Sequence, residues 1–305
     1  MSTSSIVVAV ASITAIFVGL SIILNPERKN LNGAVRARQG GSYVRLTEGI
    51  THYALEGPSG GPVIVLIHGG ITPMVTWDAY IPALKSAGFR VLRYDAYGRG
   101  YSDRPDITYD RSLYRQQLLD LLNCLNIAEP VDLVGYSHGG GIAVNFAAHY
   151  PERVHQLALI APIVHRFSLR PLLNPPLIGE FFARLTALRE IPNLLKSKHK
   201  AGPAKQIAEA LFEQTTYKGF QRSLLSMARS DAISDYLGDY QALSRQAYQV
   251  LLIRGTRDSE ITQEAIEAVR KLLPQAEFHA IADHTHGIVF ENPSQVCPLL
   301  VDFLR

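Results

Sequence analysis

The sequence predicts an α/β fold: a mostly parallel, doubly wound sheet with helices on both faces. Short apolar runs alternate with stretches of helical periodicity, which is the pattern of strand–helix–strand units. The run PVIVLI (62–67) is continuous rather than alternating, as expected of a strand covered on both faces. Further strands are expected at RVLRY (90–94), VDLVG (131–135) and QVLLI (249–253). With 305 residues, 47% of them hydrophobic, the chain can build a large core.

Composition excludes several classes of function. Thirty basic residues nearly balance 27 acidic ones, for a net charge of +3, so no nucleic-acid partner is expected. The two cysteines, Cys124 and Cys297, form no C-x-x-C pair, which argues against a zinc site and dithiol chemistry. Cys124 lies in an apolar helical pattern and is predicted to fill the core.

The first 25 residues differ from the rest. Residues 6–24 (IVVAVASITAIFVGLSIIL) carry no charge and are just long enough to cross a bilayer, so residues 1–25 are predicted to be an N-terminal transmembrane anchor. A cleaved signal peptide is the alternative, but it should have basic residues before the apolar run and a small-x-small site after it. The segment is followed by basic residues, which favour placement of the rest of the protein on the cytoplasmic face of the membrane. They are Arg28, Lys29, Arg36 and Arg38.

The remaining elements follow in order. Residues 26–41 are polar and glycine-containing and are predicted to be a linker to a domain over 42–305. A hairpin is expected over 42–55, helices near 80–87, 112–125, 138–149 and 294–304, and further strands at 157–160 and 278–281. Between about 162 and 240 the strand signal disappears, which predicts an inserted helical lid. Parallel strands present their carboxyl ends at one edge, where ligands bind.

The pentapeptide Gly135-Tyr136-Ser137-His138-Gly139 joins a buried strand to an amphipathic helix. A strand–Gly-x-Ser-x-Gly–helix turn lifts the serine above the sheet as a nucleophile, and the N–H of His138 then points toward a developing oxyanion. The alternative is an ordinary helix-capping serine. The flanking elements favour the nucleophile.

A nucleophilic serine needs further groups. His68-Gly69-Gly70 follows the first apolar strand, and the N–H of Gly70 is the candidate second oxyanion donor; a plain turn is the alternative. Asp258 follows strand 249–253 and is the candidate acid, with Glu260 as a near neighbour. His284 and His286 both follow strand 278–281, and spacing within that loop does not choose between them.

These segments together resemble the α/β-hydrolase fold family, in its lid-bearing esterase and lipase branch. The resemblance covers nearly everything from residue 42 onward. It rests on LIHGG (66–70), DAYGRGYSDRP (95–105), GYSHGGGIAVNFAAHYPERV (135–154), IRGTRD (253–258) and ADHTHGIVFENPSQV (282–296).

The resemblance implies a Ser137–His286–Asp258 triad, with the N–H groups of Gly70 and His138 as the oxyanion hole. His286 is chosen because the catalytic histidine precedes the family's E-x-P motif by a fixed step. The family usually has glycine before this histidine, where this chain has threonine, so His284 stays the second choice. Serine at 137 argues against the dehalogenases and epoxide hydrolases of this fold, which carry aspartate there.

The expected function is hydrolysis of carboxylic esters, with a small-molecule ester as substrate and no metal or organic cofactor. Apolar lid residues either shape an acyl pocket, which makes lipid-like esters such as monoacylglycerols plausible substrates, or pack only on the core: Phe167, Leu169, Leu172, Leu173, Phe181 and Phe182. Two alternatives stay open, namely hydrolysis of a carbon–carbon bond, amide or peptide by the same triad, and a non-catalytic binding protein.

Overall fold

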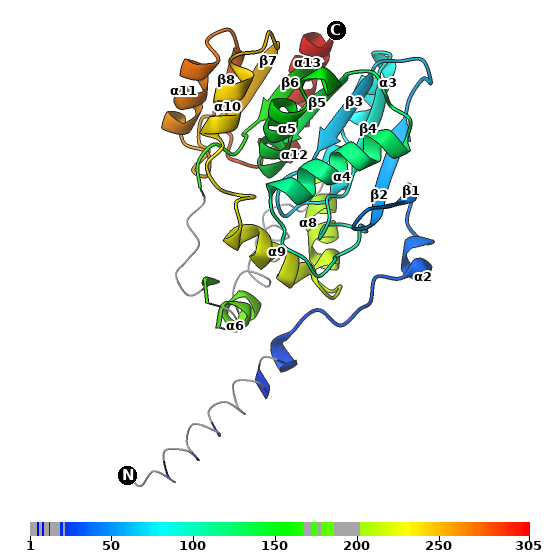
Figure 1. Ribbon diagram of the computed structural model, residues 1–305, viewed down its shortest axis with the longest axis vertical. Coiled ribbons are helices and arrows are strands. Elements are labelled where there is room, and N and C mark those ends of the chain that lie inside the picture. Colours follow the sequence, from blue (N-terminus) through cyan, green and yellow to red (C-terminus); the bar gives the residue numbers. More distant parts are fainter. Residues whose placement is uncertain are drawn as a thin grey trace.

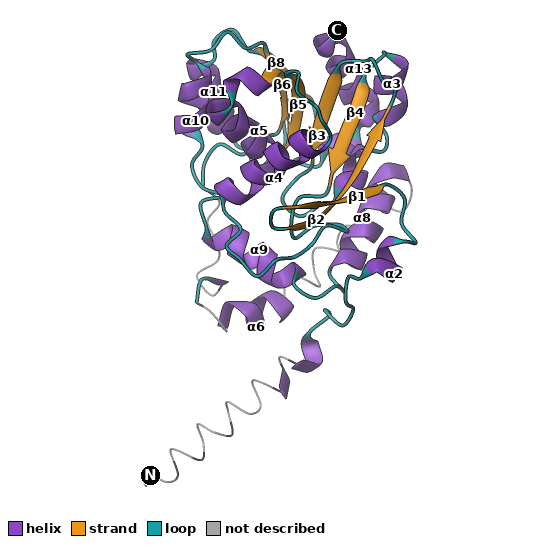
Figure 2. Cartoon of the chain, turned by 45° about the vertical axis from the view of Figure 1, so that its right-hand side comes forward, coloured by secondary structure: helices purple, strands orange, loops and turns teal. Residues whose placement is uncertain are grey.

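A computed structural model describes residues 22–166, 173–175, 178–185 and 202–305, together with Ser5, Val8, Ser12, Gly19 and Leu20. Its 8-stranded sheet has the order β1-β2-β4-β3-β5-β6-β7-β8 (Figures 1 and 2). The strands are β1 Ser42–Leu46, β2 Gly49–Glu56, β3 Val63–Ile67, β4 Arg90–Tyr94, β5 Val131–Tyr136, β6 Val154–Ile160, β7 Val250–Gly255 and β8 Glu277–Ile281.

The sheet is mixed in direction. Strand β2 pairs antiparallel with both β1 and β4. All pairs from β4 through β3, β5, β6 and β7 to β8 are parallel. The mostly parallel sheet and the N-terminal hairpin predicted from the sequence are therefore confirmed.

Helices cover both faces of the sheet (Figures 1 and 2). Helix α5 contacts α4 and α10 on one face, while α3 and α13 contact each other on the opposite face. All six residues of β5 are buried, so the serine that follows this strand emerges from the middle of the core. Outside the β6–β7 connection, the described residues include the helices α2 Gly33–Arg36, η1 Met74–Trp77, α3 Ile81–Ser86, α4 Arg111–Cys124, α5 His138–His149, η2 Pro151–Arg153, α11 Gln263–Leu272, α12 Ile288–Glu291 and α13 Pro293–Leu304.

The connection between β6 and β7 is helical and holds no strand in its described residues. It contains α6 Ile178–Leu185, α8 Gly202–Gln214, α9 Phe220–Arg229 and α10 Leu237–Leu243. Helices α6, α8 and α9 lie beyond one end of the sheet (Figure 1). Three of the apolar residues assigned to the lid lie outside the described residues, namely Phe167, Leu169 and Leu172. That this insertion acts as a lid stays a prediction.

The prediction of an N-terminal transmembrane segment needs correction. A helix must present about 20 consecutive apolar residues to cross a bilayer. Among the residues that the structure describes, no helix combines enough length with enough apolar character, and most of residues 6–24 lie outside them. This finding overturns the predicted anchor over residues 1–25 and the membrane-anchored localisation built on it.

The predicted linker, residues 26–41, lies against the domain. The N–H of Lys29 donates to the carbonyl of Thr216 at 2.9 Å, and the carboxylate of Glu27 accepts from the N–H groups of Gly219 and Gln221 at the start of α9. These contacts tie the chain before β1 to the helices of the insertion.

The prediction for Cys124 is wrong, because this cysteine is exposed. It is the last residue of α4 and lies beyond Leu121 and Leu122, the last buried positions of that helix. Cys297 is buried in α13.

Candidate active site

Ser137 occupies a sharp turn between β5 and α5. Its backbone has φ 54° and ψ −118°, a conformation that residues other than glycine rarely adopt. Its N–H donates to the carbonyl of Ile160 at 3.0 Å, and its own carbonyl accepts from the N–H of Gly140 at 3.0 Å. These bonds hold the serine in a strained conformation, which is a feature of functional sites.

The turn is so tight that both flanking glycines are required. A Cβ at Gly135 would lie 2.5 Å from the carbonyl oxygen of Gly139, and a Cβ at Gly139 would lie 2.2 Å from that of Ile67. Backbone atoms cannot move away cheaply, so only glycine fits at either position. This close packing brings the start of α5 against the end of β3.

Three side chains from three loops form one continuous chain of contacts. Nε2 of His286, in the loop between β8 and α12, lies 3.0 Å from Oγ of Ser137. Nδ1 of the same ring lies 2.9 Å from Oδ2 of Asp258, in the loop after β7. The His286 side chain is 12% exposed and that of Asp258 is fully buried. The sequence-predicted serine, histidine and acid are thus within hydrogen-bonding reach of one another.

The carboxylate fixes the protonation of the ring. An ionised Asp258 can only accept, so the proton of neutral His286 is on Nδ1 and Nε2 is free to accept from the serine hydroxyl. Burial lowers the pKa of His286, but the hydrogen bond with Asp258 and the negative charges of Glu260, Asp258 and Glu291 outweigh it and raise the pKa above the ordinary value. Burial alone would raise the pKa of Asp258. The hydrogen bond and the charge of His286, together with the two backbone hydrogen bonds, outweigh burial, so the pKa of Asp258 lies below its ordinary value.

Asp258 is held firmly in its loop. Oδ1 accepts from the N–H groups of Glu260 and Ile261 at 2.8 and 2.9 Å. The buried guanidinium of Arg254 donates to the carbonyls of Asp258 and Ile261 at 2.9 and 2.8 Å. Glu260, the neighbouring acid, does not take the place of Asp258: its Oε2 lies 3.6 Å from Nε2 of His286, on the serine side of the ring.

The structure also separates the two candidate histidines. Nε2 of His284 lies 2.8 Å from Nδ2 of Asn292. The backbone carbonyl of His284 accepts from the N–H of Arg257 at 2.9 Å. His286, and not His284, therefore reaches Ser137 and Asp258.

The two expected oxyanion donors are neighbours. A Cβ on Gly70 would lie 3.4 Å from Cβ of His138, so the backbones after β3 and at the start of α5 face each other. Neither the N–H of Gly70 nor that of His138 donates to another described residue. The His138 ring is buried and packs edge-on against Tyr114 at 4.8 Å; burial and the charge of Arg99 lower its pKa to about 3, so the ring is neutral.

Comparison with known proteins identifies the family. A family model described as the alpha/beta hydrolase fold matches residues 62–293, which is most of the chain. The chain belongs to the α/β hydrolase fold family. It is 29% identical over 253 residues to a 2-hydroxymuconate semialdehyde hydrolase of Pseudomonas sp. (strain CF600), covering 79% of this chain and 86% of that protein. It is 26% identical over 268 residues to carboxylesterase YbfK of Bacillus subtilis (strain 168), covering 86% of each.

Solved structures agree on the architecture. A meta-cleavage product hydrolase from Pseudomonas fluorescens superimposes with a TM-score of 0.69 at 26% identity, over 87% of this chain and 97% of that one. The enol-lactonase of Burkholderia xenovorans gives a TM-score of 0.72 at 21% identity, over 86% and 99%, which shows the shared fold alone. The chain is a hydrolase of this family, whose similar members differ in the bond that they cleave.

The α/β hydrolase has a buried arginine behind Gly70 that the sequence did not reveal. Nε of Arg99 donates to the carbonyl of Gly70, and Nη1 donates to Oγ of Ser223 in α9 at 2.8 Å. Nη2 of Arg99 lies 3.3 Å from the sulfur of Met227, which is also in α9. The Cε atom of Met227 in turn lies close to Gly70, 3.2 Å from the position that a Cβ would take there. Arg99 thus links the loop that carries Gly70, the candidate oxyanion donor, to a helix of the insertion.

A second link runs through Gln214 of α8. Its side-chain Nε2 donates to the carbonyl of Ile71 at 2.5 Å, and its Oε1 accepts from the N–H of Gly100 at 2.8 Å. Nothing in the local sequence pairs Gln214 with a residue 143 positions earlier. The shape of the loop after β3 therefore depends on two helices from the insertion.

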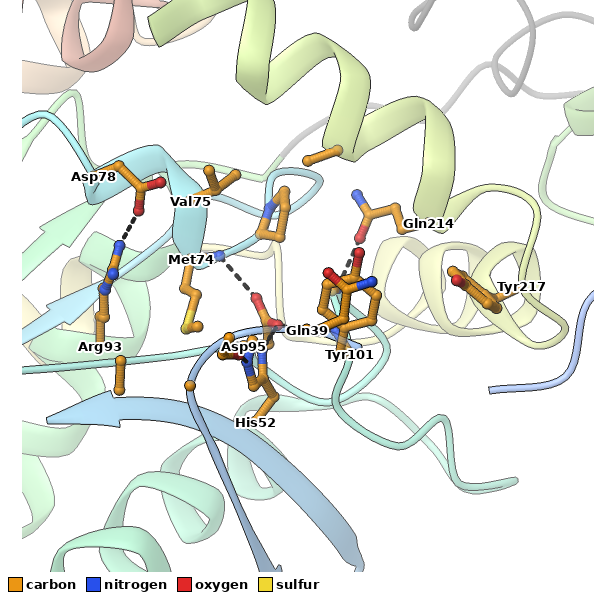
Figure 3. Close-up of a pocket in the computed structure, with 16 residues that line it drawn as sticks. Gln39, His52, Met74, Val75, Asp78, Arg93, Asp95, Tyr101, Gln214 and Tyr217 are labelled. Carbon is orange, nitrogen blue, oxygen red and sulfur yellow. Dashed lines mark hydrogen bonds and ion pairs between the residues drawn. The ribbon is translucent and has the colours of Figure 1, made fainter. Parts of the chain in front are cut away.

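A separate cavity of about 280 Å³ lies between β2, η1 and α8, and none of the three triad residues lines it (Figure 3). It contains the buried pair His52–Asp95, whose Nδ1 and Oδ2 are 2.7 Å apart. Nε2 of His52 is bound to the carbonyl of Gly40 at 2.7 Å, and Asp95 also accepts from the N–H groups of Met74 and Tyr101. Both side chains are fully engaged, so this pair ties the loop after β4 to β2.

Proposed function

We propose that this α/β hydrolase cleaves carboxylic esters through Ser137, His286 and Asp258. The observation that carries the proposal is the unbroken chain of contacts at 2.9 Å and 3.0 Å from a buried carboxylate through an imidazole to a strained serine. Serine becomes nucleophilic only beside such a base, and the base works only in the tautomer that the carboxylate selects.

In the first half of the reaction, Oγ of Ser137 attacks the ester carbonyl and its proton passes to Nε2 of His286. The imidazolium is stabilised by Asp258 on the opposite side of the ring. When the tetrahedral intermediate collapses, Nε2 returns the proton to the leaving alkoxide, and an alcohol departs from an acyl-enzyme.

The negative charge of the intermediate needs hydrogen-bond donors. The backbones of Gly70 and His138 lie close together, and neither N–H group donates to another described residue. Because the start of α5 adds its own positive end, this place suits an oxyanion.

In the second half, a water gives a proton to Nε2 of His286 and its oxygen attacks the acyl carbon. Collapse releases the carboxylic acid and restores the hydroxyl of Ser137. The cycle uses side chains, two backbone N–H groups and water.

The acyl group is expected to lie under the insertion, which we propose to be a lid over residues 162–240. Met227 of α9 lies against Gly70, next to the proposed oxyanion site. Phe181 and Phe182 of α6 are half-buried and stack on each other edge-on at 5.7 Å. Apolar side chains on the helices of the insertion suit an acyl chain, as in a monoacylglycerol.

Hydrolysis of a carbon–carbon bond is the second candidate, because similar proteins include meta-cleavage product hydrolases. The named substrate of another relative, 2-hydroxy-6-oxo-2,4-heptadienoate, carries a carboxylate. Two acids, Glu260 and Glu291, raise the pKa of His286 by their negative charge, and this field opposes an anionic substrate. The charge around His286 therefore favours the ester.

The test compares the full-length parent with Ser137→Ala. Both proteins are assayed with p-nitrophenyl esters of increasing acyl length and with the dienoate substrate. We expect ester hydrolysis by the parent and none by the variant, and the preferred acyl length will show whether the pocket holds short or lipid-like chains. Dienoate cleavage without ester cleavage would replace the proposal by the second candidate. A folded parent that cleaves neither, and that a fluorophosphonate does not label at Ser137, would be a binding protein.

A further inference from the structure

A second carboxylate stands at the catalytic nitrogen of His286. Oε2 of Glu260 lies 3.6 Å from Nε2, the same atom that faces Oγ of Ser137 at 3.0 Å. Nδ1 is already engaged by Asp258. The ring therefore has an acid on each side, and only one of them belongs to the triad.

The position of Glu260 follows from its backbone. Its N–H donates to Oδ1 of Asp258, and the next residue, Ile261, is buried and bound to the same oxygen. The Glu260 side chain is 55% exposed, whereas that of His286 is 12% exposed. Glu260 thus stands at the open edge of the imidazole, between the ring and solvent.

The reaction places the leaving group at this edge. If His286 hands a proton to the leaving oxygen, that oxygen must come within about 3 Å of Nε2. The first few atoms attached to it then lie within roughly 6 Å of the Glu260 carboxylate, a range at which charges interact measurably near a protein surface.

The charged groups near this edge leave its net charge negative. Glu291 of α12 accepts from the hydroxyl of Thr285 at 3.0 Å and adds negative charge near His286. The guanidinium of Arg254 is buried and directed at backbone carbonyls of its own loop. The guanidinium of Arg99 is also buried and donates to the carbonyl of Gly70 and to Oγ of Ser223.

We propose that Glu260 makes the leaving-group site selective for alcohols that carry a positive charge, such as amino and quaternary ammonium alcohols, and against leaving fragments that carry a carboxylate. The inference rests on the proposed ester hydrolysis and names its substrate class. Because Glu260 is half-exposed, solvent weakens the effect, and a preference of about fivefold to tenfold in kcat/KM is expected at low ionic strength.

Glu260 has a second effect that a merely structural side chain would lack. A carboxylate beside Nε2 stabilises the imidazolium, so its removal lowers the pKa of His286. The groups that face the ring are Asp258 and Glu260 from the β7–α11 loop, Glu291 from α12 and the ring of Tyr136 from β5. With Glu260 neutralised, the acidic limb of the kcat/KM profile is expected to move to lower pH.

The experiment compares the full-length parent, Glu260→Gln and Glu264→Gln, a control at an exposed position of α11. The substrates are butyrylcholine and 3,3-dimethylbutyl butyrate, which have the same shape but differ by one positive charge, and the anionic butyryl ester of 4-hydroxybutyrate. In Glu260→Gln, the cationic-to-neutral ratio of kcat/KM should fall about fivefold to tenfold and the anionic-to-neutral ratio should rise, because any change in the basicity of His286 acts on all three esters alike and cancels in the ratios. The control should match the parent, and Glu260→Asp should restore part of the preference.

The outcomes separate this inference from the proposed function. A parent that hydrolyses the neutral ester with a cationic-to-neutral ratio unchanged in Glu260→Gln overturns the role of Glu260 and leaves the triad intact. An unmoved acidic limb in the same variant also counts against it. A folded parent that hydrolyses none of the esters refutes the proposed function and this inference with it.

Discussion

Nε2 of His286 lies 3.0 Å from Oγ of Ser137, although 149 positions separate the two residues in the chain. The contact exists because β5 and β8 are parallel members of one sheet and their carboxyl ends open on the same edge. Asp258, after β7, completes the line from that edge. The chemistry that we propose depends on this convergence of three loops.

Ser137 should be strained as well as reactive. Replacement by glycine or alanine removes the nucleophile, so both variants should lose nearly all hydrolysis. Since glycine accepts φ 54° without cost, Ser137→Gly should also have a free energy of unfolding about 1 kcal/mol higher than Ser137→Ala. Urea unfolding of the two variants measures the difference. Equal stabilities would show that the turn carries no strain.

The Asp258–His286 pair should stabilise the fold most in mildly acidic solution. The raised pKa of His286 contributes stability that is complete below about 6.5 and is lost as the pH rises through the folded pKa. The lowered pKa of Asp258 contributes stability that is present above about 3.9 and is lost as the pH falls through the folded pKa. Both contributions overlap between about pH 4 and 6.5.

The variant Asp258→Asn tests this window. Its loss of unfolding free energy relative to the parent should be greater near pH 5.5 than near pH 9, as followed by urea titration at both values. The activity of the parent should rise with pH over the same range, because the base form of His286 is needed and forms only as the pH passes the raised pKa of this ring. The same substitution should lower kcat by roughly 10²- to 10⁴-fold. A stability loss independent of pH would contradict the assignment.

Gly139 should tolerate no side chain. In Gly139→Ala the new Cβ would meet backbone oxygens at 2.2 and 2.5 Å, so the free energy of unfolding should fall by about 3 kcal/mol or the variant should fail to fold. Gly238→Ala is the matched control: it lies in α10, nothing is within 4 Å of its Cβ position, and it should gain about 0.5 kcal/mol. Thermal unfolding distinguishes the two. If Gly139→Ala lost less than about 1 kcal/mol of unfolding free energy, the turn around Ser137 would have room for a side chain.

Gln214 should act through the loop that carries Gly70. Gln214→Leu removes the partners of the Ile71 carbonyl and the Gly100 N–H, which lets the loop shift. An oxyanion donor matters most in the transition state, so kcat should fall roughly 10- to 100-fold while KM stays nearly constant. Gln241→Leu, at an exposed position of α10, should be neutral. A rise in KM with unchanged kcat would assign Gln214 to substrate binding instead.

Sequence reasoning was sufficient for the elements whose signals are local. The Gly-x-Ser-x-Gly turn placed Ser137, and the polar residues after two apolar strands placed Asp258 and the histidine pair. Spacing within the histidine loop did not choose His286; the resemblance to a known motif made that choice, and the contacts of His284 with Asn292 agree with it.

The rest depends on contacts that no local pattern encodes. Arg99 lies within a visible motif, but its partner Ser223 is 124 positions away, and Gln214 is an unremarkable helical glutamine in sequence. In the sequence, Glu260 stood out only as a near neighbour of Asp258, since sequence cannot show which side of a ring a side chain faces. The apolar N-terminal run led to a membrane-anchor prediction that the described helices contradict.

The most direct test of the central claim is to trap the acyl-enzyme. Full-length parent and Ser137→Ala are mixed with p-nitrophenyl acetate, quenched at short times and analysed by peptide mass spectrometry. The account predicts an acetyl group on Ser137 of the parent that forms before steady turnover, and neither adduct nor turnover in the variant. Turnover by Ser137→Ala at the parent's rate, with no adduct on the parent serine, would contradict it.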